Sequence, residues 1–238
     1  MKLLSRFFIL LMCVAPLSAV AAESYSQITL EYELSTRGFT VGAMKETYAR
    51  SKDRYRITSV SVATGLLAAI KPETINVISE GTVTPQGLHP DTFSSIRKVD
   101  TDRSATASFD WTNKTVTLDD KRKGKRTLPL PDGTQDRASA MYQFMFLAMD
   151  NATALNFNMV NVNKLDLYSY RVSSGGRVKV PAGTFDTVYV ASTPEPGKRK
   201  KTEIWLAREH GWLPCKMIIT DEDGSRYTQE LTKFSARP

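Results

Sequence analysis

The chain has 238 residues, of which 41% are hydrophobic and 24% charged, so it is long enough to fold around a hydrophobic core of its own. Its formal net charge is +7, but no aromatic and basic recognition motif accompanies this charge, which argues against a nucleic-acid partner. Its two cysteines are Cys13, in a segment that we expect to be removed, and Cys215. A single remaining cysteine excludes an internal disulfide.

Residues 1–22 have the three-part pattern of a secretory signal peptide. A positively charged start precedes an apolar run over 7–17, and residues 19–21 satisfy the small-x-small rule for cleavage. The run is too short to span a bilayer, and Met12 before Cys13 does not suit a lipoprotein signal. We therefore predict a soluble periplasmic protein that is neither a lipoprotein nor membrane-spanning.

Strand patterns dominate the chain after residue 22. Ile28, Leu30 and Tyr32 alternate with polar residues, which predicts a half-buried strand with one wet face. Residues 65–70 are apolar without alternation, and they fit either a short helical turn or a loop over the sheet. Further strands are predicted over 39–49, 55–62, 74–83, 92–98, 105–111, 115–118 and 126–130.

The second half of the chain repeats this pattern. The small residues at 174–176 predict a hairpin between strands over 165–172 and 177–180. Turn signals at this density, with short connections, predict an all-β meander or barrel in a single domain over 23–238. The other strands are predicted over 155–162, 184–192, 202–206, 215–220 and 227–234.

The one strong helical pattern covers residues 136–150. Positions 141, 144, 145 and 148 place apolar side chains on one helical face, and a second apolar row is rotated from it. Asp136 follows a turn signal, and its carboxylate can accept from free backbone N–H groups at the start of the helix. We therefore predict a curved antiparallel sheet, or an incomplete β-barrel, packed around one main α-helix over about 136–150.

Methionines recur every four residues along this segment. They fit two interpretations: core filling by flexible thioethers, or the adaptable wall of a ligand cavity. In the second case the ligand-lining residues are Met141, Tyr142, Met145 and Met149.

The sequence contains no recognisable catalytic or metal-binding constellation. A metal site needs several ligands, and the only histidines, His89 and His210, are far apart in the chain. No G-x-S-x-G motif occurs. Cys215 alternates with Met217 and Ile219 along a predicted strand, as a buried thiol would. We predict no metal, no cofactor and no enzymatic activity.

Two basic runs fall at predicted hairpin or loop tips. They fit ordinary solvated tips that keep the protein soluble. If both lie at one end of the sheet, they form a positive rim for anionic lipid head groups, where each Lys or Arg contributes about 1 kcal/mol. The runs are Lys121, Arg122, Lys123, Lys125 and Arg126, and Lys198, Arg199, Lys200 and Lys201.

Several stretches in a fixed order carry a resemblance to a known family. They are Gly81-Thr82-Val83, Gly87-Leu88-His89-Pro90, Phe109-Asp110-Trp111, Gln135-Asp136, Ser139-Ala140-Met141-Tyr142, Val180-Pro181-Ala182-Gly183-Thr184-Phe185, Ile204-Trp205-Leu206 and Leu213-Pro214. In this order they resemble the domain of unknown function 3108 family of exported bacterial proteins. The resemblance implies a periplasmic protein with a curved antiparallel sheet wrapped around a helix. That shape is similar to the carriers that shuttle lipoproteins across the periplasm, a likeness of fold alone.

The sequence predicts a non-catalytic binding or carrier module for an apolar or lipid-like ligand. The alternative is a structural or protein-interaction module of the cell envelope, in which the helix completes a solid core and an exposed strand edge recruits a partner. An anionic membrane surface and an envelope protein are the partners that these hypotheses name.

Overall fold

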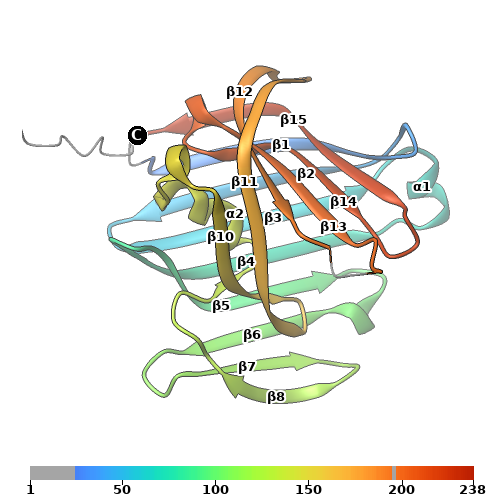
Figure 1. The fold of residues 1–238 in the computed structure, drawn as a ribbon. Coiled ribbons are helices and arrows are strands. Elements are labelled where there is room, and N and C mark those ends of the chain that lie inside the picture. Colours follow the sequence, from blue (N-terminus) through green and yellow to red (C-terminus); the bar gives the residue numbers. More distant parts are fainter. Residues whose placement is uncertain (1–24, 195–196) are drawn as a thin grey trace, which may run out of the picture.

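The structure is a computed structural model that describes residues 25–194 and 197–238 (Figure 1). The predicted signal peptide over 1–22 lies outside the described residues, so export to the periplasm stays a prediction. Most of the described residues are in strands, which confirms the predicted mainly β class.

Fifteen strands form one sheet. The N-terminal half of the sheet comprises β1 (Gln27–Thr36), β2 (Phe39–Ser51), β3 (Arg54–Ala63), β4 (Thr74–Thr84), β5 (Gly87–Arg97), β6 (Ala105–Asp110), β7 (Thr115–Asp120) and β8 (Gly124–Pro129). The C-terminal half comprises β9 (Gln135–Asp136), β10 (Ala154–Asn161), β11 (Lys164–Val180), β12 (Gly183–Ser192), β13 (Lys201–Ala207), β14 (Leu213–Thr220) and β15 (Arg226–Arg237).

The helical elements are short. Two are α-helical, α1 (Gly65–Ile70) and α2 (Ser139–Gln143). Four are single 3-10 turns: η1 (Thr101–Arg103), η2 (Phe144–Phe146), η3 (Met149–Asn151) and η4 (Arg208–His210). Among the described helices, none is long and apolar enough to cross a membrane.

Strands that follow one another along the chain mostly pair as antiparallel hairpins, and the first and last strands pair with each other inside the sheet. The order is β8-β7-β6-β5-β4-β3-β2-β1-β15-β14-β13-β12-β11-β10-β9. β1 pairs with β15, with Leu30 opposite Phe234. β9 pairs with β10 in parallel, with Gln135 opposite Met159, so the sheet is mixed.

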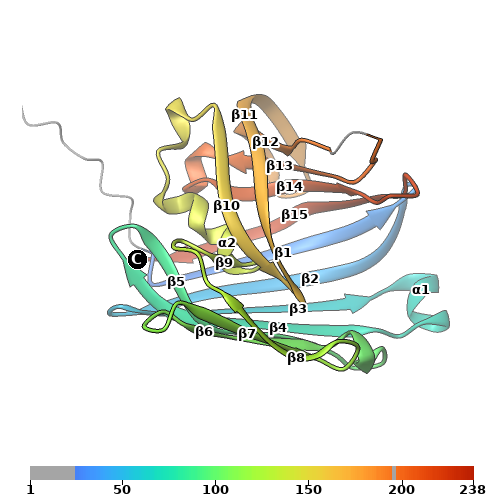
Figure 2. The ribbon, with the colours of Figure 1, turned by 60° about the horizontal axis from the view of Figure 1, so that its bottom comes forward.

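The sheet curls without closing. Figures 1 and 2 show β10 and β11 crossing over the N-terminal half, with α2 between the two halves. The last strand, β9, thereby returns to β5, where the side-chain amide of Gln135 donates to the carbonyl oxygen of Leu88 at 2.8 Å. β5 pairs with β4 and β6 rather than with β9, so the sheet stays open.

Alternating side chains build the core on the concave face. In β6 the apolar positions Ala105, Ala107 and Phe109 are buried, and the polar positions between them are exposed, as expected for a strand with one wet face. One buried cluster contains Tyr32, Tyr48, Ile57, Phe93 and Leu118. A second, under the C-terminal half, contains Phe144, Met149, Tyr170, Val190 and Ile204.

The predicted helix over 136–150 is wrong in its extent. α2 spans only Ser139–Gln143, and Leu147 is extended, with φ −105° and ψ 146°. Tyr142 belongs to the first buried cluster, whereas Phe144 and Met149 belong to the second. A short helix contributes little stability by itself, so tertiary packing decides where it ends.

The hairpin predicted at residues 174–176 is also wrong. β11 runs without a turn from Lys164 to Val180, and its register against β12 shifts between Ser174 and Gly176. Gly176 has φ +63°, and its carbonyl oxygen accepts from the hydroxyl group of Thr187 at 2.9 Å. The glycines therefore form a β-bulge that bends one long strand. That residues 23–238 are a single domain stays a prediction.

Candidate functional site

The concave face of the sheet and α2 line a partly open cavity of about 300 Å³. This volume is at the lower end of the range for small-molecule sites. Both halves of the sheet contribute to its wall. The lining residues are Tyr32, Met44, Glu46, Ser59, Val77, Arg137, Ala138, Met141, Met159, Asn161, Tyr168, Tyr170, Lys200, Thr202, Pro214, Met217, Ile219 and Gln229.

Four methionines from four separate elements line this cavity. Met44 comes from β2, Met141 from α2, Met159 from β10 and Met217 from β14. An unbranched thioether adapts to irregular apolar surfaces, so a wall of methionines can accommodate ligands of different shape. We call this space the methionine cavity.

Two opposite charges, Glu46 and Arg137, line the wall of the methionine cavity. Burial raises the pKa of Glu46, while a hydrogen bond with Ser59 and the charge of Arg137 oppose this rise. Burial lowers the pKa of Arg137, and the charge of Glu46 opposes that change. Carboxylate and guanidinium therefore compensate each other in part at one point of a mostly apolar wall.

Tyr142 lies behind this pair. Its ring stacks on that of Tyr48, with 5.3 Å between the ring centroids. Burial, followed by the charge of Glu46, raises the pKa of the hydroxyl group, which therefore stays protonated. That hydroxyl group is buried and has no hydrogen-bond partner of normal geometry among the described residues. The side chain of Glu46 is near enough to interact with it, so Tyr142 and Glu46 form one buried polar cluster at the cavity wall.

Asp136 fixes the start of α2 against the sheet. Its carboxylate accepts from the backbone N–H groups of Ala138 at 2.8 Å and Ser139 at 2.9 Å, but the N-cap of α2 is Ala138, so the predicted N-cap position is wrong. The other carboxylate oxygen accepts from the hydroxyl group of Ser79 on β4 at 2.5 Å. Burial raises the pKa of Asp136, and these hydrogen bonds oppose the rise. The network holds Met141 in position over the methionine cavity.

The predicted ligand-lining residues separate in the structure. Met141 lines the methionine cavity, and Tyr142 is buried behind its wall. Met149 is buried in the second cluster, and Met145 packs against the first. A ligand-binding role for these four residues stays a prediction. Sequence reasoning missed Met44, Glu46, Arg137, Met159 and Met217, whose positions depend on strand register and on the curl of the sheet.

The two basic runs lie partly in turns or loops and partly on strands. Lys121, Arg122 and Lys123 form the β7–β8 turn, with Lys125 and Arg126 on β8, and the second run leads into β13. Three of these cations have acidic partners: Lys121 with Asp102 at 3.7 Å, Arg126 with Asp120 at 3.2 Å, and Lys201 with Glu203 at 2.9 Å. Lys200 lines the methionine cavity. Contact with an anionic surface stays a prediction.

The histidines and the cysteine are packed as structural residues. His89 lies against the ring of Trp111 at 3.8 Å, and His210 stacks on Phe234 at 4.0 Å. Cys215 is fully buried. Among residues 25–194 and 197–238, no three His, Cys, Asp or Glu side chains gather as metal ligands would.

Comparison with known proteins identifies the family. The family model described as "Protein of unknown function (DUF3108)" matches residues 31–232. The chain belongs to the DUF3108 family. A search of curated proteins found no match to this DUF3108 chain.

One solved structure supports the fold of this DUF3108 chain. It is a β-barrel-like protein of domain of unknown function DUF1849 from Brucella abortus, with a TM-score of 0.56 and 13% sequence identity. The match covers 90% of this chain and 98% of the Brucella chain. The MucA/MucB complex of Pseudomonas aeruginosa has a TM-score of 0.39 at 12% identity, covering 89% of this chain and 52% of that one. The likeness to the Brucella protein shows a shared fold and nothing about activity.

Proposed function

We propose that this protein is a non-catalytic binding or carrier module that holds the apolar part of a lipid-like ligand in the methionine cavity. The observation that carries the proposal is the cavity itself, about 300 Å³ between α2 and a curled sheet, with methionines from four elements in its wall. Export to the periplasm, which the sequence of residues 1–22 predicts, is part of the same proposal.

The distribution of polar groups supports an amphiphilic ligand. The apolar wall includes Val77, Pro214 and Ile219 in addition to the methionines. Charged side chains are few: Glu46 and Arg137 lie at one place in the wall, and Lys200 at another. A site of this kind buries the apolar part of a ligand and uses a few polar side chains to orient the ligand.

The first test is the binding of an uncharged apolar probe, N-phenylnaphthylamine, followed by its fluorescence. Met217→Trp places a larger side chain in the methionine cavity and should weaken probe binding by about tenfold or more, since a filled cavity offers no apolar surface. The matched control is Val60→Trp. Val60 lies on β3 and is 41% exposed. The neighbouring Ser59 lines the cavity, so the side chain of Val60 points away from the cavity, to the opposite face of the strand.

Binding that is lost in Met217→Trp and retained in Val60→Trp supports the proposal. Probe binding that is absent, or equal in the three proteins, contradicts it. Lipid mass spectrometry of natively purified protein identifies any ligand that copurifies.

The alternative is an envelope interaction module that uses a free strand edge. β8 is the last strand at one end of the sheet, and the side chains along it are exposed or half-buried. An unpaired edge can pair with an extended segment of another protein. Crosslinking of one specific protein to β8, together with failure of probe binding, would favour this function over the carrier.

A further inference from the structure

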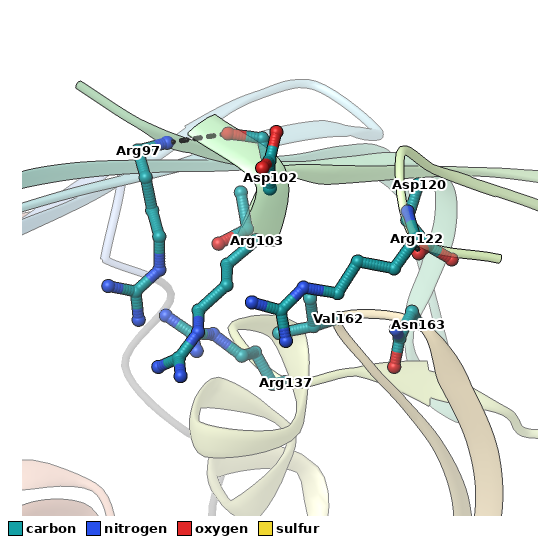
Figure 3. Close-up of a pocket in the computed structure, with 10 residues that line it drawn as sticks. Arg97, Asp102, Arg103, Asp120, Arg122, Arg137, Val162 and Asn163 are labelled. Atoms are coloured by element: carbon teal, nitrogen blue, oxygen red, sulfur yellow. Dashed lines mark hydrogen bonds between the residues drawn. The ribbon is translucent and has the colours of Figure 1, made fainter. Parts of the chain in front are cut away.

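A second pocket, of about 200 Å³, lies where the ends of several elements meet (Figure 3). Four arginines border it: Arg97 at the end of β5, Arg103 in η1, Arg122 in the β7–β8 turn and Arg137 between β9 and α2. Figure 3 shows their guanidinium groups extending toward the same space. Positions so far apart in the sequence share this pocket only because β9 returns to β5.

The acids that border this pocket are engaged elsewhere. The carboxylate of Asp120 is buried and accepts from the backbone N–H groups of Arg122 at 3.0 Å and Lys123 at 2.9 Å, and from the guanidinium of Arg126 at 3.2 Å. The carboxylate of Asp102 forms an ion pair with the ammonium group of Lys121, with 3.7 Å between Oδ1 and Nζ. Neither acid forms an ion pair with any of the four bordering arginines.

The four arginines are incompletely neutralised. Arg103 pairs with Asp100 at 3.1 Å, and Arg97 reaches Glu73 only at 3.5 Å. The side chains of Arg122 and Arg137 form no ion pair within the described part of the chain. Burial lowers the pKa of Arg137, and the charge of Arg97 acts in the same direction, while the charges of Glu46 and Asp136 offset part of this effect. Like charges gathered in this way repel one another, and an anion bound between them would remove that repulsion.

The β10–β11 turn completes the pocket with a strained residue. Val162 has φ +60°, in the left-handed region that β-branched side chains rarely adopt. Val162 and Asn163 both border the pocket. Strain of this kind persists where the surrounding structure enforces it, and it is concentrated at binding sites.

We propose that Arg97, Arg103, Arg122 and Arg137 bind the phosphate group of an anionic ligand. The planar fork of arginine matches the oxygens of phosphate in a bidentate manner. Arg137 lines both this pocket and the methionine cavity, so one molecule can place its phosphate among the arginines and its apolar part among the methionines. This second step, which makes the ligand a phosphate-bearing amphiphile, rests on the proposed function.

The test is titration calorimetry of the purified protein with three ligands: dihexanoyl phosphatidate, dihexanoylglycerol and inorganic phosphate. The double variant Arg103→Gln/Arg122→Gln removes two largely exposed members of the site and should weaken phosphatidate binding by about tenfold or more. The charge-matched control, Arg54→Gln/Arg177→Gln, removes two exposed arginines that pair with Asp91 and Asp186 and should leave it unchanged.

The outcomes separate the two proposals. Phosphatidate binding about tenfold tighter than that of dihexanoylglycerol, lost in the double variant but not in the control, supports the phosphate site. Inorganic phosphate that binds as tightly as phosphatidate overturns the link to the methionine cavity. Absence of saturable binding by phosphatidate and phosphate overturns the phosphate site itself. N-phenylnaphthylamine should bind the double variant as it binds the wild type, so failure of the cavity is detected independently.

Discussion

At the scale of single residues, burial determines the chemistry of Cys215. Its thiol donates to the carbonyl oxygen of Trp205 at 3.4 Å. Burial raises the pKa of this thiol to about 12, so the reactive thiolate is scarce near neutral pH. We expect iodoacetamide at pH 8 to leave Cys215 unmodified in the folded protein and to modify it fully in denaturant, as measured by peptide mass spectrometry. Rapid modification without denaturant would contradict this placement of the residue.

Glu46 should give the protein a pH dependence of its own. Because burial raises its pKa above the unfolded value of about 4.3, the folded state binds this proton more tightly than the unfolded state does. The free energy of unfolding therefore decreases as pH rises from that value through the raised pKa. Each unit of difference between the folded and unfolded pKa corresponds to about 1.4 kcal/mol.

The variant Glu46→Gln mimics the protonated side chain and does not titrate. It should therefore lack the loss of stability that Glu46 causes as pH rises. We expect urea unfolding to show a larger stability gain, relative to the wild type, at pH 7 than at pH 4. An equal difference at both pH values would show that Glu46 is not desolvated in the folded protein.

Part of this residue-scale information was present in the sequence. Met44, Glu46 and Tyr48 share one face of β2, so Glu46 interrupts an otherwise apolar row. A lone acid on a buried face signals a polar site. The nearby charge of Arg137 could not be predicted, because its position depends on the return of the segment after β9 to the concave face.

At the scale of elements, α2 is held in place by side chains rather than by its own length. The side-chain amide of Gln143 accepts from the backbone N–H of Leu88 at 2.7 Å and donates to the carbonyl oxygen of Gln86 at 2.9 Å. Gly87 allows this close approach. A Cβ atom there would lie 2.3 Å from Oε1 of Gln143, and its φ of +112° is outside the range open to other residues.

Gly87→Ala should therefore lower the free energy of unfolding by about 2–4 kcal/mol, since it adds backbone strain and displaces the Gln143 amide. The matched control is Gly133→Ala. Gly133 has φ +70°, and a Cβ atom there has no neighbour within 4 Å, so only about 1–2 kcal/mol should be lost. Urea unfolding of both variants measures the difference, and equal losses would refute the proposed docking of α2.

Strand alternation explains which elements the sequence could predict. The pattern around Ile28 gave β1, and the continuous apolar run over 65–70 proved to be α1, one of the two structures that it fits. The extent of α2 and the bulge at Gly176 were missed for a common reason. Local patterns fit a long helix and a hairpin, whereas packing against two separate clusters and against Thr187 decided otherwise.

At the scale of the whole molecule, the curl of one open sheet creates both pockets. The pairing of β1 with β15 joins the halves, and the contact of Gln135 with Leu88 brings β9 back to β5. Neither contact has a local sequence signal, because it depends on residues far apart in the chain. The sequence therefore predicts the class of fold and a role for methionines, but not which methionines face one another.

The binding of an apolar ligand in the methionine cavity is tested most directly by NMR of methyl-labelled methionines during titration with N-phenylnaphthylamine. We predict that the methyl signals of Met44, Met141, Met159 and Met217 shift together, because these side chains line one cavity. Those of Met145 and Met149, which are not part of the cavity lining, should stay in place. Shifts confined to Met145 and Met149, or no shift at any methionine at saturating probe, would contradict the account.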